Sequence, residues 1–157
     1  MHAADSKSFW RGMLLLGVVL ALLRGANVAY VLHCSQRDGI AYYDGPDTFS
    51  YVGNAEAMFD ERPMSPLFRE RVAYPFLLAA VKAIGLEYSD LLWLTVPLEI
   101  PSVLAMALLG LTLTRRKTVA ALGALVYALN PNGYQLSAVL MADWFNGQVM
   151  LMGMALA

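Results

Sequence analysis

Hydrophobic and polar positions divide the chain into long apolar stretches and one polar stretch. Residues 12–33 are almost wholly apolar, and so are 91–114, 118–131 and most of 138–157. An apolar run of about 20 residues is long enough to cross a bilayer as a helix. The pattern therefore predicts an all-α membrane protein with about four transmembrane helices, and residues 34–90 form a polar loop between the first two.

The first apolar stretch reads as a transmembrane helix. Trp10 and Tyr30 bracket it at the separation of the two interfacial aromatic belts of a bilayer. A cleaved signal peptide is the alternative, because the apolar core at 13–23 has a suitable length for one. However, residues 24–29 offer no clean pattern of small residues for cleavage. We therefore favour an uncleaved first helix.

Two shorter helical patterns lie inside the 34–90 loop. After a Gly-Pro turn at 45–46, apolar residues recur at three-to-four spacing over 49–59, which predicts an amphipathic helix. A second helix is predicted over 75–84, with Gly85 as its stop signal. This second helix is too short to cross the hydrocarbon core alone. Both are expected to lie along the membrane surface.

Two charges fall inside apolar stretches, where a charge is costly and points to protein, water or an anionic group. Arg24 lies past the middle of the first stretch. It is expected either to reach the outer headgroups along its aliphatic stem or to contact a lipid phosphate. Glu99 lies between Pro97 and Pro101, which should kink the 91–114 helix. It is expected to be paired or protonated, with no partner evident.

Basic residues set the predicted topology. Lys7 and Arg11 precede the first helix, and residues 115–117 (Arg-Arg-Lys) follow the 91–114 helix. The positive-inside rule places both clusters in the cytoplasm, so an even number of crossings separates them. The 75–84 helix therefore should not cross, and the 34–90 loop should be extracytoplasmic. We expect a multi-pass plasma (inner) membrane protein with a cytoplasmic N-terminus.

The composition agrees with a membrane protein and argues against nucleic acid as a partner. The chain is 59% hydrophobic and 15% charged, whereas about a quarter of a soluble domain is charged. Its net charge is −1, and it has no basic stripe of the kind that binds nucleic acid. The single cysteine, Cys34, excludes an internal disulfide and offers no metal cluster. Because residues 149–157 are an apolar run without a polar stop, we expect the sequence to be the front part of a longer protein.

Candidate chemistry gathers in the polar loop. The stretch 42–51 holds Asp44 and Asp47, a Gly-Pro turn and four aromatic rings. Asp47, Tyr51 and Ala55 are spaced by one helical turn each, which puts an acid, a phenol and a small residue on one face. Further on, the run Arg69-Glu70-Arg71 comes shortly before Tyr74-Pro75.

In order and spacing, these features resemble the N-terminal part of the GT-C fold membrane glycosyltransferases that use polyprenyl-phosphate-linked sugars. Protein O-mannosyltransferases and aminoarabinose transferases are of this kind. Arg24 matches an arginine near the outer end of the first helix, and Asp47, Tyr51 and Ala55 match an Asp-x-x-x-Tyr-x-x-x-Ala element. Residues 71–75 are similar to an Arg-x-Pro-Gly-Tyr-Pro element, with Val-Ala in place of Pro-Gly. Asp143 matches an acid that precedes a later helix.

The resemblance implies an activity: inverting transfer of a sugar from a polyprenyl-phosphate carrier to an extracytoplasmic lipid, glycan or protein. It implies that Asp47 is the catalytic carboxylate, which must lie opposite the leaving phosphate and within reach of the acceptor hydroxyl. The leaving phosphate needs cations, for which arginine is suited. The implied substrate-binding residues are Asp44, Tyr51, Arg24, Arg69, Arg71, Tyr74 and Asp143. The resemblance implies no organic cofactor, but a divalent cation bound by Asp143 is a candidate.

Other interpretations of the same residues remain open. Asp44 or Asp47 can serve only as the N-terminal cap of the following helix, and Tyr51 as an interfacial belt residue. The chain as a whole can be a non-catalytic assembly subunit or a fragment of a transporter or flippase. A transporter predicts that the mid-membrane charges Arg24 and Glu99 matter more than the loop acids.

Overall fold

The computed structural model describes residues 3–41, 48–63, 73–130 and 142–156. These residues form helices and no strand, so the prediction of an all-α protein is confirmed. In chain order the elements are α1 (Ala3–Asp38), α2 (Thr48–Phe59), α3 (Ala73–Ala83), the 3₁₀ turn η2 (Tyr88–Asp90), α4 (Leu91–Thr95), α5 (Glu99–Thr114), α6 (Lys117–Ala128) and α8 (Ala142–Leu156).

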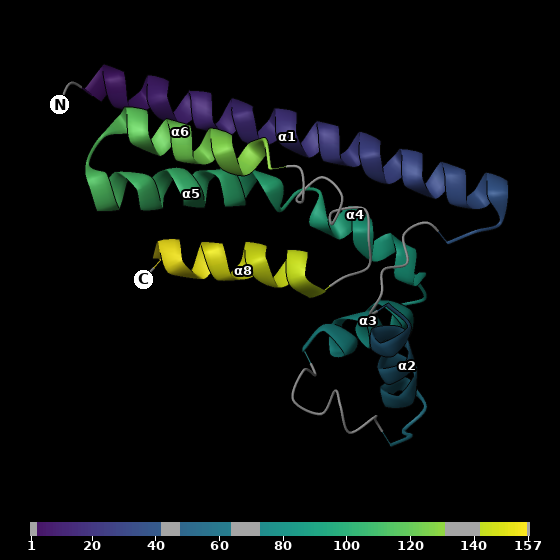
Figure 1. Cartoon of the computed structure of the whole chain (residues 1–157). Coiled ribbons are helices and arrows are strands. Elements are labelled where there is room, and N and C mark those ends of the chain that lie inside the picture. The colour runs from purple at the N-terminus through teal and green to yellow at the C-terminus, as the bar shows by residue number, and fades with distance from the viewer. Residues whose placement is uncertain (1–2, 42–47, 64–72, 131–141, 157) are drawn as a thin grey trace.

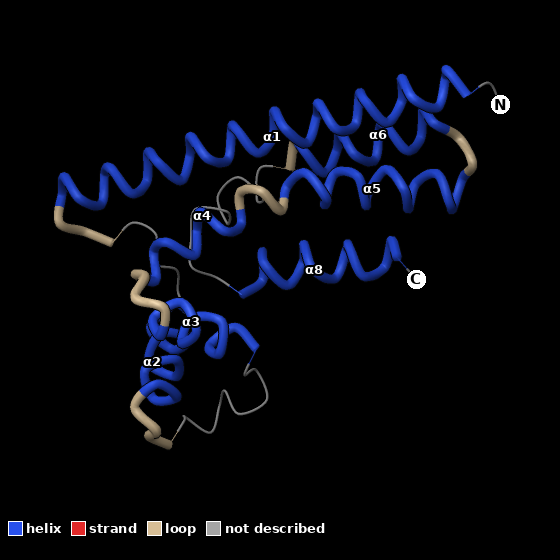
Figure 2. Tube along the Cα trace, turned by 180° about the vertical axis from the view of Figure 1, so that it is seen from behind, coloured by secondary structure: helices blue, strands red, loops and turns tan. Residues whose placement is uncertain are grey.

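The helices form two groups along α1 (Figure 1). The bundle consists of α5, α6, α8 and the N-terminal half of α1, with α5 packed against each of the other three. The lobe consists of α2 and α3, which pack on each other near the far end of α1. Seen from behind in Figure 2, α4 and η2 again connect the bundle to the lobe.

One end of the bundle collects basic residues. The N-terminus of α1 and the turn between α5 and α6 lie at the same end in Figure 1, away from the lobe. This basic end carries Lys7, Arg11, Arg115, Arg116 and Lys117. Arg115 ends α5 in the left-handed conformation (φ 55°), which lets the chain reverse at once into α6.

Helix α1 is longer than the predicted 12–33. Its 36 residues extend about 54 Å at 1.5 Å per residue, more than the roughly 30 Å of a hydrocarbon core. Trp10 and Tyr30 are about 30 Å apart along it, and Leu15 and Leu22 between them are exposed. By length and composition, α1 is the one helix in the described part of the chain that can cross a membrane by itself.

The predicted 91–114 helix is broken in two. Helix α4 ends at Thr95, α5 begins at Glu99, and the two directions differ by 41°. Pro97 lies in the break and cannot donate a backbone hydrogen bond, so the predicted kink is confirmed. On either side, the hydroxyls of Thr95 and Ser102 donate to carbonyls one turn earlier at 2.7 Å, a contact that bends helices.

The expectation of four separate spanning helices is wrong for the described residues. Helices α6 and α8 have 12 and 15 residues, so they extend only about 18 and 22 Å. Helix α5 reaches spanning length only together with η2 and α4, as one bent unit. The apolar run at 118–131 overstated α6, because the helix ends at Ala128 although the apolar pattern continues to Leu129. Residues 138–141 of the other predicted helix lie outside the described residues.

Small residues bring the bundle helices close together. A Cβ on Gly17 would lie 3.0 Å from the Cα of Ile100, and one on Gly110 would lie 2.7 Å from the Cα of Ala120. Helices α1, α5 and α6 therefore meet nearly backbone to backbone. The buried side chains at their interface are mostly small as well, and they are Leu20, Val103, Ala107, Ala124 and Ala128.

We expect Gly110→Ala to destabilise the bundle by about 1–3 kcal/mol, because the new methyl group would push α5 away from the α6 backbone. Gly153→Ala in α8 is the matched control, since its Cβ would meet nothing within 4 Å. It should be neutral or stabilising by up to about 1 kcal/mol. Thermal unfolding in bicelles, followed by circular dichroism, measures both; equal melting temperatures would contradict the close α5–α6 contact.

A second buried cluster joins the lobe to the rest of the molecule. From α2 and α3 it takes Tyr51, Ala55, Tyr74, Leu78 and Val81, and it is completed by Val28 of α1 with Leu91 and Leu92 of α4. On the lobe surface, Lys82 lies 3.4 Å from Glu56 and within 6 Å of two aromatic rings, Phe59 and Tyr88. The lobe is therefore packed on α4 and α1 and is not a free-standing loop.

Candidate functional site

The starts of α2 and α3 meet in a pair of tyrosines. The rings of Tyr51 and Tyr74 lie 5.2 Å apart, edge to face with an interplanar angle of 80°. Tyr51 is in the first turn of α2 and Tyr74 is the second residue of α3. Edge-to-face pairs of this kind stabilise packing beyond the area they bury. The two sequence elements of the predicted site are therefore held together at the helices that follow them.

Apart from Arg24, the charged side chains of the predicted site are not among those that the structure describes. Asp44 and Asp47 precede α2, and Arg69 and Arg71 precede α3, in ranges that are not described. Asp143 lies in the first turn of α8, and its side chain is likewise not described. The roles predicted for these residues stay predictions.

Tyr51 and Tyr74 are packed differently from the open platforms on which sugars stack. Only 3% of Tyr51 and 5% of Tyr74 are exposed. Burial, with a smaller contribution from the neighbouring Tyr51, raises the pKa of the Tyr74 phenol well above its ordinary value. Tyr51 is not on the lipid-facing surface expected of an interfacial belt residue. Its contribution to the site is to join α2 to α3, and its predicted substrate contact stays a prediction.

The raised pKa of Tyr74 makes stability depend on alkaline pH. The folded chain holds the phenol proton more tightly than the unfolded chain does. The free energy of unfolding should therefore fall above about pH 10, by roughly 1.4 kcal/mol per pH unit. Tyr74→Phe cannot lose that proton, so its stability should decline less steeply. Urea unfolding between pH 9 and about 11 measures the difference, and parallel curves for the two proteins would contradict burial of Tyr74.

The bundle encloses a second candidate site, a buried polar cluster formed by Arg24, Glu99, Tyr127 and Gln148. Arg24 Nε lies 3.6 Å from Glu99 Oε1, and both side chains are fully buried. Gln148 Nε2 donates to the same oxygen at 3.1 Å. The Tyr127 hydroxyl donates to Glu99 Oε2 at 3.2 Å. One carboxylate therefore joins four helices: α1, α5, α6 and α8.

This cluster corrects what the sequence suggested for Arg24. A guanidinium that reaches the headgroups would be exposed at its tip, whereas Arg24 is 0% exposed. Its described partner is Glu99, the acid for which no partner was evident from the sequence. A cation beside a carboxylate that also accepts two hydrogen bonds is an arrangement that makes burial of both charges tolerable. The phosphate role of Arg24 stays a prediction.

Tyr127 and Gln148 were missed by the sequence reasoning. Each is a polar residue inside an apolar helix, flanked by Val126 and Ala128 in one case and by Gly147 and Val149 in the other. A polar side chain in such a setting usually bonds to another helix, and that signal could have selected both. Their partner could not have been chosen, because Glu99 is far from either in sequence.

The two candidate sites are adjacent along α1. Arg24 belongs to the polar cluster, and Val28, one turn later, belongs to the buried cluster that contains Tyr51 and Tyr74. The break between α4 and α5 falls in the same region, since Gly25 faces Val96 and Trp93. A shift of α1 would therefore be felt in both sites.

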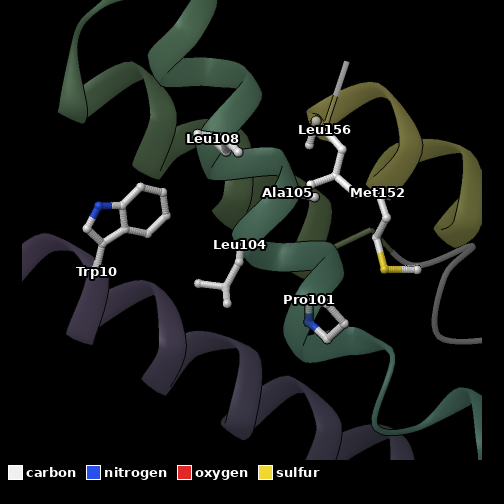
Figure 3. Close-up of a pocket in the computed structure, with 8 residues that line it drawn as sticks. Trp10, Pro101, Leu104, Ala105, Leu108, Met152 and Leu156 are labelled. Carbon is white, nitrogen blue, oxygen red and sulfur yellow. The ribbon is translucent and has the colours of Figure 1, made fainter.

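An apolar cavity of about 300 Å³ lies between α1, α5 and α8. Figure 3 shows the Trp10 indole of α1 beside Leu104 and Leu108 of α5, with Met152 and Leu156 reaching in from α8. Pro101 and Ala105 of α5 and Ala155 of α8 complete its walls. Hydrocarbon is the chemistry that this lining can accept.

The described residues bring no three His, Cys, Asp or Glu side chains together as a metal site. The side chain of Asp143, the candidate ligand for a divalent cation, is not among those described. Comparison with family models, with curated proteins and with solved structures found no match to this chain.

Proposed function

We propose that this chain is part of a membrane glycosyltransferase that moves a sugar from a polyprenyl-phosphate carrier to an extracytoplasmic acceptor. The observation that carries the proposal is the contact between Tyr51 and Tyr74. The Asp-x-x-x-Tyr element and the Arg-x-x-Tyr-Pro element are separate in sequence, yet the helices that they begin pack on each other. A transferase needs its carboxylate and its phosphate-binding arginines around one substrate, and this packing favours that arrangement.

The geometry of the helices supports a membrane location. We infer two crossings, one by α1 and one by the bent unit of η2, α4 and α5, with α6 and α8 packed in the same layer. The basic end lies at the N-terminal end of α1, whereas the lobe lies beside its C-terminal half (Figure 1). With the basic end in the cytoplasm, the lobe is extracytoplasmic. Two crossings also satisfy the even number that the basic clusters require.

Packing also favours an uncleaved α1. Arg24 pairs with Glu99, and Val28 belongs to the buried cluster around Tyr51 and Tyr74. Removal of a signal peptide would take the first of these contacts from the bundle and leave Glu99 without its cation. We therefore propose that α1 stays in the mature protein as its first membrane helix.

In the proposed reaction, the acceptor hydroxyl attacks the anomeric carbon of the donor sugar while the bond from that carbon to the phosphate oxygen breaks. Asp47 takes the hydroxyl proton from the face opposite the phosphate, so the configuration inverts. Arg69 and Arg71 stabilise the negative charge that develops on the departing polyprenyl phosphate. Asp44 and Asp143 orient the acceptor, and a divalent cation is a candidate at Asp143.

A transfer assay tests the proposal. The chain, in liposomes with a polyprenyl-phosphate-linked sugar on the lobe side, should release polyprenyl phosphate when a hydroxylated acceptor is added. The assay uses the longest reading frame that contains this sequence, which gives the fullest form of the protein. Absence of both release and donor binding in that form would overturn the proposal.

A transporter or flippase fragment is the second candidate, favoured by the buried cluster around Glu99. Ionisable side chains in pairs inside a membrane bundle commonly mark substrate or ion pathways. The two candidates differ in one comparison. Glu99→Gln should impair a transporter more than Asp47→Asn does, whereas a transferase should lose activity mainly through Asp47→Asn.

A further inference from the structure

The apolar cavity between α1, α5 and α8 begins near the buried polar cluster and extends toward the basic end of the bundle. On α5 its walls begin two residues after Glu99, at Pro101, and on α8 they begin four residues after Gln148, at Met152. Along both helices the cavity therefore begins within about one turn of the buried polar cluster. Its walls extend to Leu108 on α5 and to Leu156 on α8, which are both exposed, in the direction of the basic end of the bundle.

Several cations lie toward that end of the bundle. Lys7 and Arg11 are one turn apart on α1, and Lys7 lies one turn before Trp10, which lines the cavity. Both are exposed. Arg115 and Arg116, in the turn after α5, are exposed at the same end of the bundle (Figure 1). An amphiphile with an anionic head and a hydrocarbon tail would match both the cations at this end and the apolar walls of the cavity.

We propose that this cavity binds one acyl chain of an anionic phospholipid from the leaflet at the basic end. The chain lies between Trp10 and α8, along Leu104 and Ala105, and stops below the Glu99 cluster. The headgroup phosphate lies near Lys7 and Arg11, at the level where tryptophan and basic side chains sit in membranes. Such a lipid completes the packing of α8, whose helix contacts are chiefly with α5.

The site does not depend on the transferase proposal, since it uses none of its residues. It is also separate from the extracytoplasmic substrate, because its lining residues come from α1, α5 and α8 and none comes from the lobe. Its failure would leave the proposed function standing, and the reverse is equally true.

Native mass spectrometry of the full chain, purified in mild detergent from vesicles that contain phosphatidylglycerol and phosphatidylethanolamine, tests this site. The wild-type chain should retain one phosphatidylglycerol. Ala105→Phe from α5 and Ala155→Phe from α8 fill the cavity from two sides, and each should lower retention at least about tenfold, because the ring displaces two or more buried methylene groups of about 0.8 kcal/mol each. Leu113→Phe is the matched control, since Leu113 is exposed on α5 outside the cavity and should change nothing.

Charge variants test the headgroup separately from the cavity. The double variant Lys7→Gln with Arg11→Gln should retain phosphatidylglycerol no better than phosphatidylethanolamine, while Arg37→Gln at the far end of α1 keeps the wild-type preference. Circular dichroism confirms that each variant is folded. Wild-type chain without bound lipid, equal retention of the two lipids by the wild type, or undiminished retention by both filled variants would overturn the proposal.

Discussion

Replacing Glu99 with leucine is expected to destabilise the bundle by about 3–5 kcal/mol, the cost of breaking a buried ion pair by removing one partner. Arg24 would then lie fully buried without the Glu99 carboxylate at 3.6 Å. A loss of this size is a large part of the free energy of unfolding of a small domain, so a large fraction of the protein molecules should be unfolded or degraded.

The double variant, in which both Arg24 and Glu99 are leucine, should recover most of that loss. It removes the charge together with its partner, and apolar replacements of buried pairs are often nearly neutral. It should remain below the wild type by about 2 kcal/mol, because Tyr127 and Gln148 lose their shared acceptor. Steric trapping or urea unfolding in bicelles gives the stabilities of the wild type, Glu99→Leu, Arg24→Leu and the double variant. If the losses of the two single variants simply add in the double variant, Arg24 and Glu99 are not coupled.

The change Asp47→Asn is expected to lower the rate of sugar transfer by about 10²–10⁴-fold, the usual contribution of a general base. An amide keeps the size and the capping ability of the side chain but cannot accept the proton of the acceptor hydroxyl. Donor binding should change little, since the phosphate contacts are proposed at arginines. Initial rates of polyprenyl phosphate release, with donor binding measured in parallel, separate the two effects.

Asp60→Asn is the matched control for Asp47→Asn. It makes the same chemical change in the same lobe, at an exposed carboxylate that pairs with Arg62 at 2.8 Å on the surface. Surface pairs of this kind contribute little to stability. A full transfer rate in Asp47→Asn, or an equal loss in both variants, would remove Asp47 from the proposed chemistry and leave it as a helix cap.

Local signals in the sequence predicted local structure well. The three-to-four spacing over 49–59 and the stop at Gly85 gave helices close to α2 and α3. Pro97 marked the break between α4 and α5, because proline removes a backbone donor wherever it falls. Hydropathy was a poorer guide to length. It merged α4 with α5 and overstated α6, which ends at Ala128.

Contacts between distant residues could not be predicted in the same way. Arg24 and Glu99 were each recognised as costly charges, but nothing in a single sequence pairs one with the other. Tyr127 and Gln148 were missed because a lone polar residue in an apolar helix does not indicate which residue it contacts. In the predicted site, Tyr51 and Tyr74 were expected at the substrate and were found packed on each other. Residue spacing predicts which face of a helix a residue occupies, but it does not predict which residues cover that face.

The proposed function rests on one claim, that the lobe and the basic end lie on opposite sides of a membrane. Cys34 is buried, so its replacement by alanine gives a cysteine-free background. Gly53→Cys places a thiol on the exposed face of α2, where its Cβ meets nothing within 4 Å. Thr118→Cys places one at the exposed start of α6, beside the basic end. The two positions probe the two ends of the molecule.

Labelling of these two cysteines in intact cells with a membrane-impermeant thiol reagent tests that claim most directly. We predict that Gly53→Cys reacts from outside, and that Thr118→Cys reacts only after the cells are permeabilised. Reaction of both positions from the same side, or reaction of Thr118→Cys alone in intact cells, would contradict an extracytoplasmic lobe and the transferase proposal with it.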